Sequence, residues 1–447
     1  MTQIIKELRP YRSLIEIFSR FKDEEDAVLL DSSLHNHLGR YSIMGRRPYI
    51  KLVQSDTLTV NGQSSPLTID RYLKEYLDKN HRENNTDLPI TQGAIGYFSY
   101  EYGRQTMGIR SRHRDETGIP LCILNFYDEF IIEDLAAKKV FLIANGNLQP
   151  PGRAIKNLEA AIKNITEPHS DKKEYIPKIN ANFNSKEYMD TLEKMLYYIV
   201  EGDIYIANMT QQISAESRRS PYEVFLKLRH INPSPFGSYL NYGDFKVISA
   251  SPERFLRLKD NSVTTRPIKG TRKRGADLQK DEALKRELQN SGKDKSELLM
   301  IVDLERNDLN KVCVPGTVKV TELFTIEEYA TVFHLVSTIK GQLAPEYNGA
   351  DLIKATFPGG SITGAPKIRA MEIIDELEHD SRNLYTGSLG YIDLDGAMDL
   401  NIIIRTLLYK DGVYRIGAGG GITFESEPEF EYEEAWQKAK ALLEALR

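Results

Sequence analysis

Three short runs near the middle of the chain constrain its fold most. Positions 236–242, 245–249 and 254–258 are rich in aromatic and β-branched residues, which favour strands. The turn sequences Asn-Tyr-Gly-Asp and Ser-Pro lie between them. Turns this short join neighbouring strands that run in opposite directions. The segment therefore predicts an antiparallel sheet at the centre of the molecule.

Helical spacing of apolar residues follows this segment. It predicts helices over 278–289, 295–308, 363–378 and 429–446, with strands between them. Upstream, Ser185 can cap a helix that Gly202 ends, and strands are predicted over 27–30, 41–44, 125–133 and 139–144. The chain as a whole predicts an α/β (α+β) fold in which helices cover central antiparallel sheets.

A polar, lysine-rich stretch with two prolines spans positions 167–182 and predicts a junction. We expect an N-terminal subdomain over 1–166 and a catalytic subdomain over 183–447. The chain has 447 residues, ample to bury a large core, and we expect the two parts to interleave in one unit.

Composition excludes several classes of function. A net charge of −5 argues against nucleic acid as the main partner, because phosphate backbones require a basic face. Cys122 and Cys313 are far apart and suit neither a disulfide framework nor a metal site. No apolar run exceeds six residues, and the first residues lack the apolar stretch of a signal peptide. We expect a soluble cytoplasmic protein with no membrane partner.

Lys269 stands between Pro267 and Gly270, two residues that shape the backbone. Four cations flank it: Arg266, Arg272, Lys273 and Arg274. Crowded positive charge favours a neutral amine, which can act as a nucleophile, and the same cations can hold an anionic substrate. The alternative is an ordinary solvated basic loop.

Two glycine-rich segments can hold anions through backbone N–H groups. The first, at 357–367, leads into a predicted helix. It is not a nucleotide-binding P-loop, because Ala365 and Pro366 follow Gly364 where Lys-Ser/Thr is required. The second, at 417–421, can meet a carboxylate or can simply form a tight strand bend.

Carboxylates are grouped where a hard cation can bind. Glu431 and Glu434 are three residues apart at the start of the last helix, so both can point to one side. Glu297 starts another predicted helix. Mg²⁺ takes oxygen ligands from one or two carboxylates and keeps positions for a substrate oxygen. Alternatively, these acids only complement helix dipoles.

Three further polar residues interrupt apolar surroundings. Arg405 lies in an apolar run, where its charge needs an anion: a substrate carboxylate or an internal acid. Glu253 follows Ser-Pro at a strand edge and can exchange protons, or can be structural. His334 is flanked by apolar residues, as core histidines also are.

These segments resemble the chorismate-utilising enzymes, a family that includes the anthranilate, aminodeoxychorismate, isochorismate and salicylate synthases. The resemblance runs from about Ser185 to the C-terminus. It rests on Ser251-Pro252-Glu253, Arg266-Pro267-Ile268-Lys269-Gly270-Thr271, Asp303-Leu304-Glu305-Arg306-Asn307-Asp308, the 359–367 loop, and Glu431 with Glu434. Leu29-Leu30-Asp31-Ser32 and Gly39-Arg40-Tyr41-Ser42 resemble the N-terminal part of the two amine-adding members.

The resemblance implies a role for each of these positions. Glu297, Glu431 and Glu434 correspond to ligands of Mg²⁺, which holds the ring carboxylate of chorismate. Glu253 corresponds to the general acid, and His334 to a histidine of the same pocket. The implied substrate contacts are Gly270, Thr271, Ser361, Thr363, Tyr385, Arg405, Gly419, Gly420 and Gly421. Ser32, Pro235 and Phe236 match part of a tryptophan pocket found in relatives.

Position 269 discriminates within the family. Anthranilate synthases typically carry alanine there, whereas many aminodeoxychorismate synthases carry the lysine found here. In those relatives the lysine attacks C2 of chorismate as the C4 hydroxyl leaves, and ammonia then enters at C4. The resemblance therefore implies formation of 4-amino-4-deoxychorismate, a step toward para-aminobenzoate and folate, with anthranilate synthase as the alternative enzyme.

Two departures bear on the source of nitrogen. Ile206 stands where water-using relatives have a lysine base and many amine-using relatives a glutamine. This argues against isochorismate synthesis and leaves open what orients ammonia. Neither cysteine lies in a glutaminase nucleophile turn, so the resemblance implies a separate glutamine amidotransferase subunit. The non-enzyme alternative is a regulatory subunit that binds chorismate or tryptophan.

Overall fold

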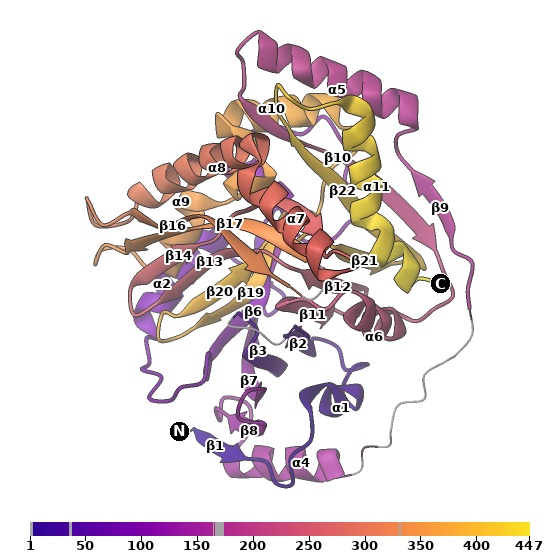
Figure 1. The fold of residues 1–447 in the computed structure, drawn as a ribbon. Helices are drawn as coiled ribbons and strands as arrows, with labels where there is room; N and C mark the ends of the chain where they lie inside the picture. The colour runs from indigo at the N-terminus through magenta and orange to yellow at the C-terminus, as the bar shows by residue number, and fades with distance from the viewer. Residues whose placement is uncertain (1–2, 35–37, 164, 166–173, 330–331) are drawn as a thin grey trace.

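The computed structural model describes residues 3–34, 38–163, 165, 174–329 and 332–447. Two long antiparallel strands, β3 (Tyr41–Gln54) and β7 (Cys122–Asp134), form the root of its sheet. Two arms of strands extend from this root and carry the residues of the predicted site. The predicted antiparallel arrangement with covering helices is confirmed (Figure 1).

The first arm leaves β3 and ends beside the C-terminal helix. Its strands pair in the order β2 (Val28–Asp31), β11 (Phe236–Asn241), β12 (Phe245–Ser251), β21 (Thr406–Lys410), β22 (Val413–Ile422), β10 (Ile206–Glu216) and β9 (Lys178–Ala181). The short β18 (Gly364–Ala365) also pairs with β10. This arm brings the glycine-rich strand β22 to the site.

The second arm leaves β7 and ends at the lysine-bearing strand. Its strands pair in the order β6 (Gly93–Phe98), β19 (Ser388–Asp393), β20 (Met398–Asn401), β13 (Arg254–Lys259), β14 (Ser262–Thr265) and β17 (Val332–Gln342), and β17 also pairs with β15 (Ile268–Lys273) and β16 (Lys319–Glu328). Four further strands border the root: β1 (Ile4–Glu7), β4 (Leu58–Val60), β5 (Gln63–Ser64) and β8 (Lys139–Ala144).

Each arm joins the N-terminal part of the chain to the C-terminal part. Strand β2 pairs with β11 in the first arm, and β6 pairs with β19 in the second. The two predicted subdomains therefore share hydrogen-bonded ladders, as the expected interleaving requires. Residues 166–173, where the predicted junction begins, lie outside the described part of the chain.

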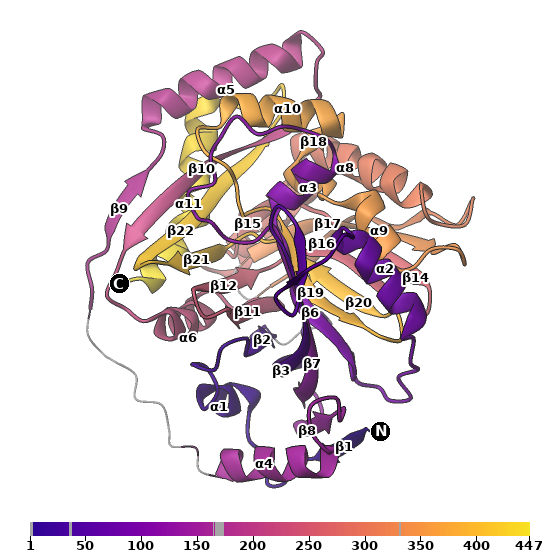
Figure 2. The ribbon, with the colours of Figure 1, turned by 180° about the vertical axis from the view of Figure 1, so that it is seen from behind.

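Helices pack against both arms (Figures 1 and 2). Near the first arm are α1 (Leu14–Ser19), α5 (Ser185–Val200), α6 (Pro221–Ile231), α10 (Lys367–Leu377) and α11 (Pro428–Ala445). Helix α4 (Pro151–Lys163) packs on β8 and β1 beside the root. Near the second are α2 (Ile69–Lys79), α7 (Leu278–Asn290), α8 (Gly292–Asn310) and α9 (Gly349–Thr356). The N-terminal halves of α8 and α11 face one another across the gap between the arms.

Several predicted helix starts were wrong: α8 begins at Gly292 rather than at residue 295, and two other errors have a clear cause. Asn184, not Ser185, caps α5, because its side chain accepts from the Glu187 N–H while Glu187 accepts from the Asn184 N–H. The helix predicted over 363–378 is α10, which begins at Lys367 rather than at Thr363. Residues 363–366 cannot be helical, because the Thr363 carbonyl accepts from Asn208 and Gly364–Ala365 pair with β10 as β18.

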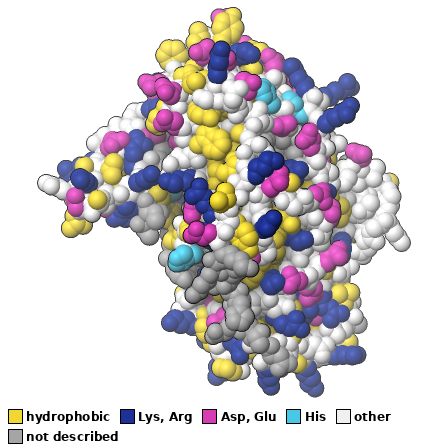
Figure 3. Space-filling model, turned by 90° about the vertical axis from the view of Figure 1, so that its right-hand side faces the viewer, with side chains coloured by type: hydrophobic (Ala, Val, Ile, Leu, Met, Phe, Trp, Pro, Cys, Tyr) yellow, Lys and Arg dark blue, Asp and Glu magenta, His cyan; other side chains and the backbone are white. Residues whose placement is uncertain are grey.

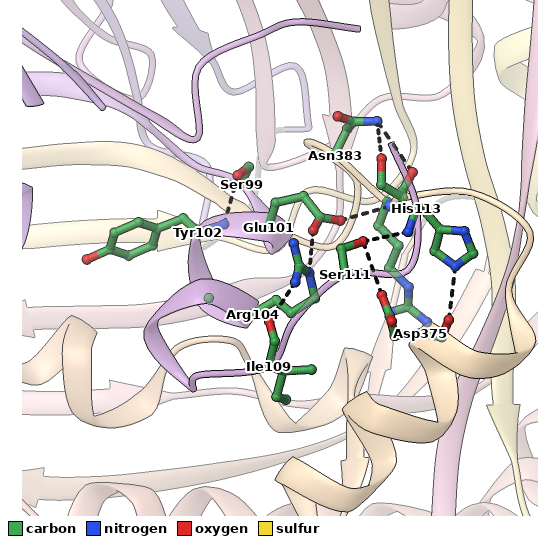
Figure 4. A network of polar contacts seen from close by, with 12 residues as sticks. Ser99, Glu101, Tyr102, Arg104, Ile109, Ser111, His113, Asp375 and Asn383 are labelled. Carbon is green, nitrogen blue, oxygen red and sulfur yellow. Dashed lines mark hydrogen bonds and ion pairs between the residues drawn. The ribbon is translucent and has the colours of Figure 1, made fainter. Parts of the chain in front are cut away.

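A polar network fastens the N-terminal part of the chain to the segment that leads into the site (Figure 4). Ser99 caps the short helix α3 (Tyr100–Thr106), which presents Glu101 to Arg104 at 2.6 Å and to the Arg382 N–H at 3.1 Å. Asp375, at the end of α10, accepts from Ser111 at 3.3 Å. The backbone that precedes Tyr385 is thus held from both sides.

The face shown in Figure 3 mixes charges of both signs, with apolar side chains gathered over its upper middle. This pattern agrees with the small net charge of the sequence. Among the residues that the structure describes, no helix has the length and apolarity to cross a membrane.

Candidate active site

A cavity of about 360 Å³ opens where the two arms approach each other. Strands β15 and β17 form one wall, β22 forms the opposite wall, and α8 and α11 close the end. Ser361 and Ile362, from the loop 359–363, form its floor together with Glu253. The cavity brings together segments that are far apart in the sequence, as the predicted site requires.

Lys269 extends from β15 into this cavity. Its Nζ donates to the Ser361 carbonyl at 3.2 Å and lies 3.1 Å from the position that a Cβ on Gly421 would take. Ile206 also contacts this position, at 3.4 Å. The amine is therefore held between the loop 359–363 and β22, beside the apolar side chain of Ile206 rather than a base.

The expected crowding of Lys269 by cations was wrong. Each neighbouring guanidinium group meets its own carboxylate: Arg266 with Glu327, Arg272 with Asp294, and Arg274 with Asp281. Arg272 and Asp294 both line the cavity, and Lys273 is exposed. Local sequence placed these cations together, but a carboxylate offsets the charge of each guanidinium.

Glu253 is buried beneath the loop 359–363. Ser361 donates through its hydroxyl to Glu253 Oε1 at 2.8 Å, so one serine contacts both Glu253 and Lys269. Burial raises the pKa of Glu253, opposed by the serine hydrogen bond and by the charge of Lys269. A raised pKa suits a carboxyl group that delivers a proton.

Two carboxylates meet over Gly420. A Cβ at this glycine would lie 3.1 Å from Glu434 Oε2 and 3.2 Å from Glu431 Oε2. Burial raises the pKa of Glu431, helped by Glu434. Burial also opposes ionisation of Glu434, but Lys438, at 2.8 Å, holds its pKa below the usual value.

Glu297 completes the acidic wall from the second turn of α8, not from the helix start that the sequence predicted. Burial raises the pKa of Glu297 to about 7, with Lys269 and Lys293 opposing and Glu431 reinforcing the shift. Lys293 reaches Glu431 Oε1 at 3.5 Å. The ammonium groups of Lys269 and Lys293 thus partly neutralise the negative charge of Glu297 and Glu431.

The fit of these acids to Mg²⁺ can be judged from their oxygens. The described residues contain no group of three or more His, Cys, Asp or Glu side chains in a ready metal-binding arrangement. Glu431 and Glu434 nevertheless converge on one point beside Gly420, and Lys438 Nζ lies 3.2 Å from the same point. Mg²⁺ commonly takes one or two carboxylates together with substrate oxygens, so this pair fits once the Lys438 ammonium moves away from it.

Arg405 projects toward the cavity from the loop before β21. Its guanidinium donates to the Lys438 carbonyl, and no carboxylate of the described residues forms an ion pair with it. Burial lowers the pKa of Arg405, partly offset by Tyr385 and Glu434. Of the two partners that the sequence left open, the internal acid is thus absent, and a substrate anion fits.

Tyr385 and the glycines of β22 define the opposite wall. The Tyr385 ring covers Gly417 so closely that a Cβ there would lie 2.1 Å from the ring. A Cβ at Gly419 would lie 2.0 Å from the Met209 carbonyl, so close strand packing also requires that glycine. Gly419, Gly420 and Gly421 all line the cavity.

His334 and Thr271 face each other at the rim. Thr271 Oγ1 lies 2.9 Å from His334 Nδ1, and burial lowers the pKa of His334 to about 4, so the imidazole is neutral. Gly270 adopts φ +69, and a Cβ there would lie 2.7 Å from Leu288. All three residues line the cavity as predicted.

Thr363 is not among the described residues that line the cavity, whereas all the other predicted substrate contacts are. Its hydroxyl donates to the Gly359 carbonyl at 2.8 Å and so closes the turn of the loop. Sequence reasoning missed Lys438 and Lys293. Lys438 follows Glu434 by four residues on a helix, a spacing that signals an ion pair.

The predicted tryptophan pocket is also a cavity. Ser32, Pro235 and Phe236 line a space of about 660 Å³, bordered by β2, β3 and β11 and by β13, β19 and β20 of the second arm. Ser32 Oγ contacts the Tyr41 carbonyl at 2.8 Å and the Pro235 carbonyl at 3.1 Å. Its ligand stays a prediction.

Comparison with known proteins decides the family. The model of the chorismate binding enzymes matches residues 32–444. This chain belongs to that family. It is therefore a chorismate-utilising enzyme, and the expected family resemblance is confirmed.

Two kinds of chorismate-utilising relative match at similar identity. Anthranilate synthase component 1 of Acetivibrio thermocellus is 35% identical, over 97% of this chain and 92% of the relative. Aminodeoxychorismate synthase component 1 of Klebsiella aerogenes is 36% identical, over 96% of this chain and 95% of the relative. The crystal structure of anthranilate synthase component I from Streptococcus pneumoniae superposes with a TM-score of 0.82 at 30% identity, covering 92% and 93% of the two chains.

Proposed function

We propose that this enzyme aminates chorismate at C4, giving 4-amino-4-deoxychorismate, with ammonia supplied by a separate glutamine amidotransferase subunit. The observation that carries the proposal is the position of Lys269, whose amine enters the cavity and shares Ser361 with the buried Glu253. A nucleophile and an acid are thus fixed against one loop, where they can serve C2 and C4 of one small ring.

Each residue has a defined part in the proposed reaction. Lys269 Nζ, after it gives up its proton, forms a bond to C2 of chorismate, the ring double bonds shift, and the C4 hydroxyl leaves as water with a proton from Glu253. Ammonia then bonds to C4 as the C2–nitrogen bond breaks and the lysine is released. The sum is chorismate plus ammonia giving the amine plus water.

The remaining residues bind and orient the dianion in this proposal. Arg405 pairs with one substrate carboxylate, and the N–H groups of the β22 glycines contact the other. Glu434 and Glu431, with Glu297 beside them, would hold Mg²⁺. When bound, Mg²⁺ supplies positive charge that neutralises and positions the ring carboxylate.

Anthranilate synthase is the second candidate, favoured by the relatives of that name and by the TM-score of 0.82. It would release pyruvate and form an aromatic product. Mass spectrometry of the product made from chorismate, ammonium and Mg²⁺ separates the two reactions. Anthranilate as the main product would exclude our proposal.

Lys269→Ala tests the covalent step. We expect intact-protein mass spectrometry to find a chorismate-derived adduct on the wild type and none on the variant, with amination reduced at least about 100-fold, because an alanine offers no amine to the substrate. Lys273→Ala, at an exposed position of the same strand, is the matched control and should keep both. An adduct that persists on Lys269→Ala would remove this lysine from the reaction.

A further inference from the structure

One buried hydrogen-bond acceptor of the catalytic cavity has no partner within the described chain. Asn208, on β10, is among the residues that line the cavity. Its side-chain oxygen Oδ1 is buried and accepts no hydrogen bond from any residue that the structure describes. Buried polar atoms are normally hydrogen-bonded, and leaving one unpaired is costly. An unpaired amide oxygen in a cavity therefore calls for a donor that belongs to a ligand.

The position of Asn208 places its amide beside the reacting amine. Asn208 lies opposite Gly421 in the ladder between β10 and β22. Side chains of opposite residues stand on the same face, with their Cβ atoms about 4.5–5.5 Å apart. The position that a Cβ on Gly421 would take is 3.1 Å from Lys269 Nζ, so the amide and the amine share one side of the ladder. Lys269 gives its hydrogen bond to the Ser361 carbonyl, which leaves the amide oxygen open to a ligand.

The backbone of Asn208 is fixed to the loop 359–363. Its N–H donates to the Thr363 carbonyl at 2.8 Å. Its carbonyl accepts from Arg382, whose guanidinium also donates to the Ile362 carbonyl at 2.9 Å. The loop that contacts the proposed acid therefore also holds this amide in place, through backbone contacts that a side-chain substitution leaves unchanged.

The side chain that precedes Asn208 on the same face of β10 is that of Ile206, because strand side chains alternate between the two faces. Ile206 is apolar and offers ammonia no hydrogen bond. An amide oxygen, by contrast, accepts hydrogen bonds and cannot donate them. Ammonia bound to such an oxygen is held through an N–H group, and its lone pair stays free to form a new bond. Asn208 thus carries the kind of orienting group that position 206 lacks.

We infer that Asn208 orients ammonia for its attack on C4. Asn208 Oδ1 accepts an ammonia N–H and turns the lone pair toward the ring. As the bond from nitrogen to C4 forms, the ring double bonds shift back and the bond from C2 to Lys269 breaks. The electron pair of that bond returns to the lysine nitrogen, which takes one proton from the new C4 ammonium group. The inference rests on the proposed covalent route with ammonia.

Asn208→Leu tests the inference, because it removes the acceptor at nearly the same size. Ser214→Ala, on the same face of β10 but outside the described lining of the cavity, is the matched control. Each protein is first mixed with chorismate alone, and the Lys269 adduct is measured by intact-protein mass spectrometry. Ammonium is then added, and loss of the adduct is followed by rapid quenching.

We expect equal adduct formation in wild type, Asn208→Leu and Ser214→Ala, because ammonia takes no part in that step. The ammonium concentration that gives the half-maximal rate of adduct loss should rise at least about tenfold in Asn208→Leu, since one hydrogen bond to ammonia is lost. It should stay at the wild-type value in Ser214→Ala. The KM for chorismate should remain within about twofold of wild type in both variants.

Asn208→Ala provides a second, smaller substitution, and circular dichroism checks that every variant is folded. A wild-type response to ammonium in folded Asn208→Leu and Asn208→Ala would overturn the inference. Slower adduct formation or a raised KM for chorismate, with an unchanged response to ammonium, would assign the amide to chorismate and also overturn it. Absence of both adduct and amination in the wild type would refute the proposed function itself, and the role of Asn208 with it.

Discussion

The protonation state of Glu305, a carboxyl group buried beneath the loop 359–363, can be tested directly. It lies on α8, buried under Gly360, whose Cβ position is 3.5 Å from Glu305 Cγ. Thr265 Oγ1 is 2.7 Å from the Phe255 carbonyl and 2.9 Å from Glu305 Oε2. The hydroxyl has one proton and the carbonyl can only accept, so both contacts are hydrogen bonds only if Glu305 carries a proton.

Burial supports the same protonation state. It raises the pKa of Glu305 to about 8, opposed by the Thr265 hydrogen bond and reinforced by Glu253. Because the folded-state pKa is above the unfolded value, the stabilising contribution is complete below the unfolded pKa of about 4.5 and is lost as pH rises toward 8. The titration of Glu305 should therefore lower the free energy of unfolding by about 2 kcal/mol between pH 6 and pH 8.

Glu305→Gln keeps the shape and removes the titration. We expect its free energy of unfolding, relative to wild type, to rise by about 2 kcal/mol between pH 6 and pH 8, measured by urea titration at both values. Taking the difference between the two proteins cancels other titrating groups. Asp303→Asn, at an exposed position of the same helix, should show no such change. Parallel pH profiles for Glu305→Gln and wild type would refute the neutral carboxyl.

Two other substitutions probe the cavity walls. Glu434→Gln should abolish Mg²⁺-dependent turnover of chorismate, because a neutral amide is a poor ligand for a hard cation. The control Glu429→Gln, at an exposed position of the same helix, should retain this turnover. Unchanged Mg²⁺ dependence in Glu434→Gln would contradict the ligand assignment. Gly417→Ala should lower kcat/KM for chorismate by about 10- to 100-fold, since displacing the Tyr385 ring costs roughly 1–3 kcal/mol. The control is Gly292→Ala, because a Cβ at Gly292 would meet nothing within 4 Å. Equal kcat/KM values in both variants would show that the position of the ring does not matter.

Strands and helices with a clear local signal were predictable from sequence. The strand at 139–144 matches β8, and the turn after position 242 does join the antiparallel neighbours β11 and β12. The turn after position 251 was predicted wrongly, because β13 pairs with β14 and β20 in the second arm and not with β12. The helix start at Thr363 failed because pairing with β10 overrides local periodicity there. Tertiary pairing of this kind leaves no trace in a single window of sequence.

Some features of the site were also predictable from sequence, and others were not. Spacing placed Glu431 and Glu434 on one face, and the apolar run around Arg405 signalled its need for an anion. The direction of the arginines around Lys269 could not be predicted, because their acidic partners come from α7, α8 and β16. Charge counted along the sequence therefore misjudged the surroundings of the amine.

The shared ladders also bear on how this protein is made. Strand β6 emerges from the ribosome long before β19, the neighbour that completes its pairing, and β2 likewise precedes β11. Domains usually fold as they are synthesised, starting from the N-terminus, but here the early strands keep open edges until late translation. The nascent chain should consequently depend on chaperones, and fragments that end before β19 should aggregate.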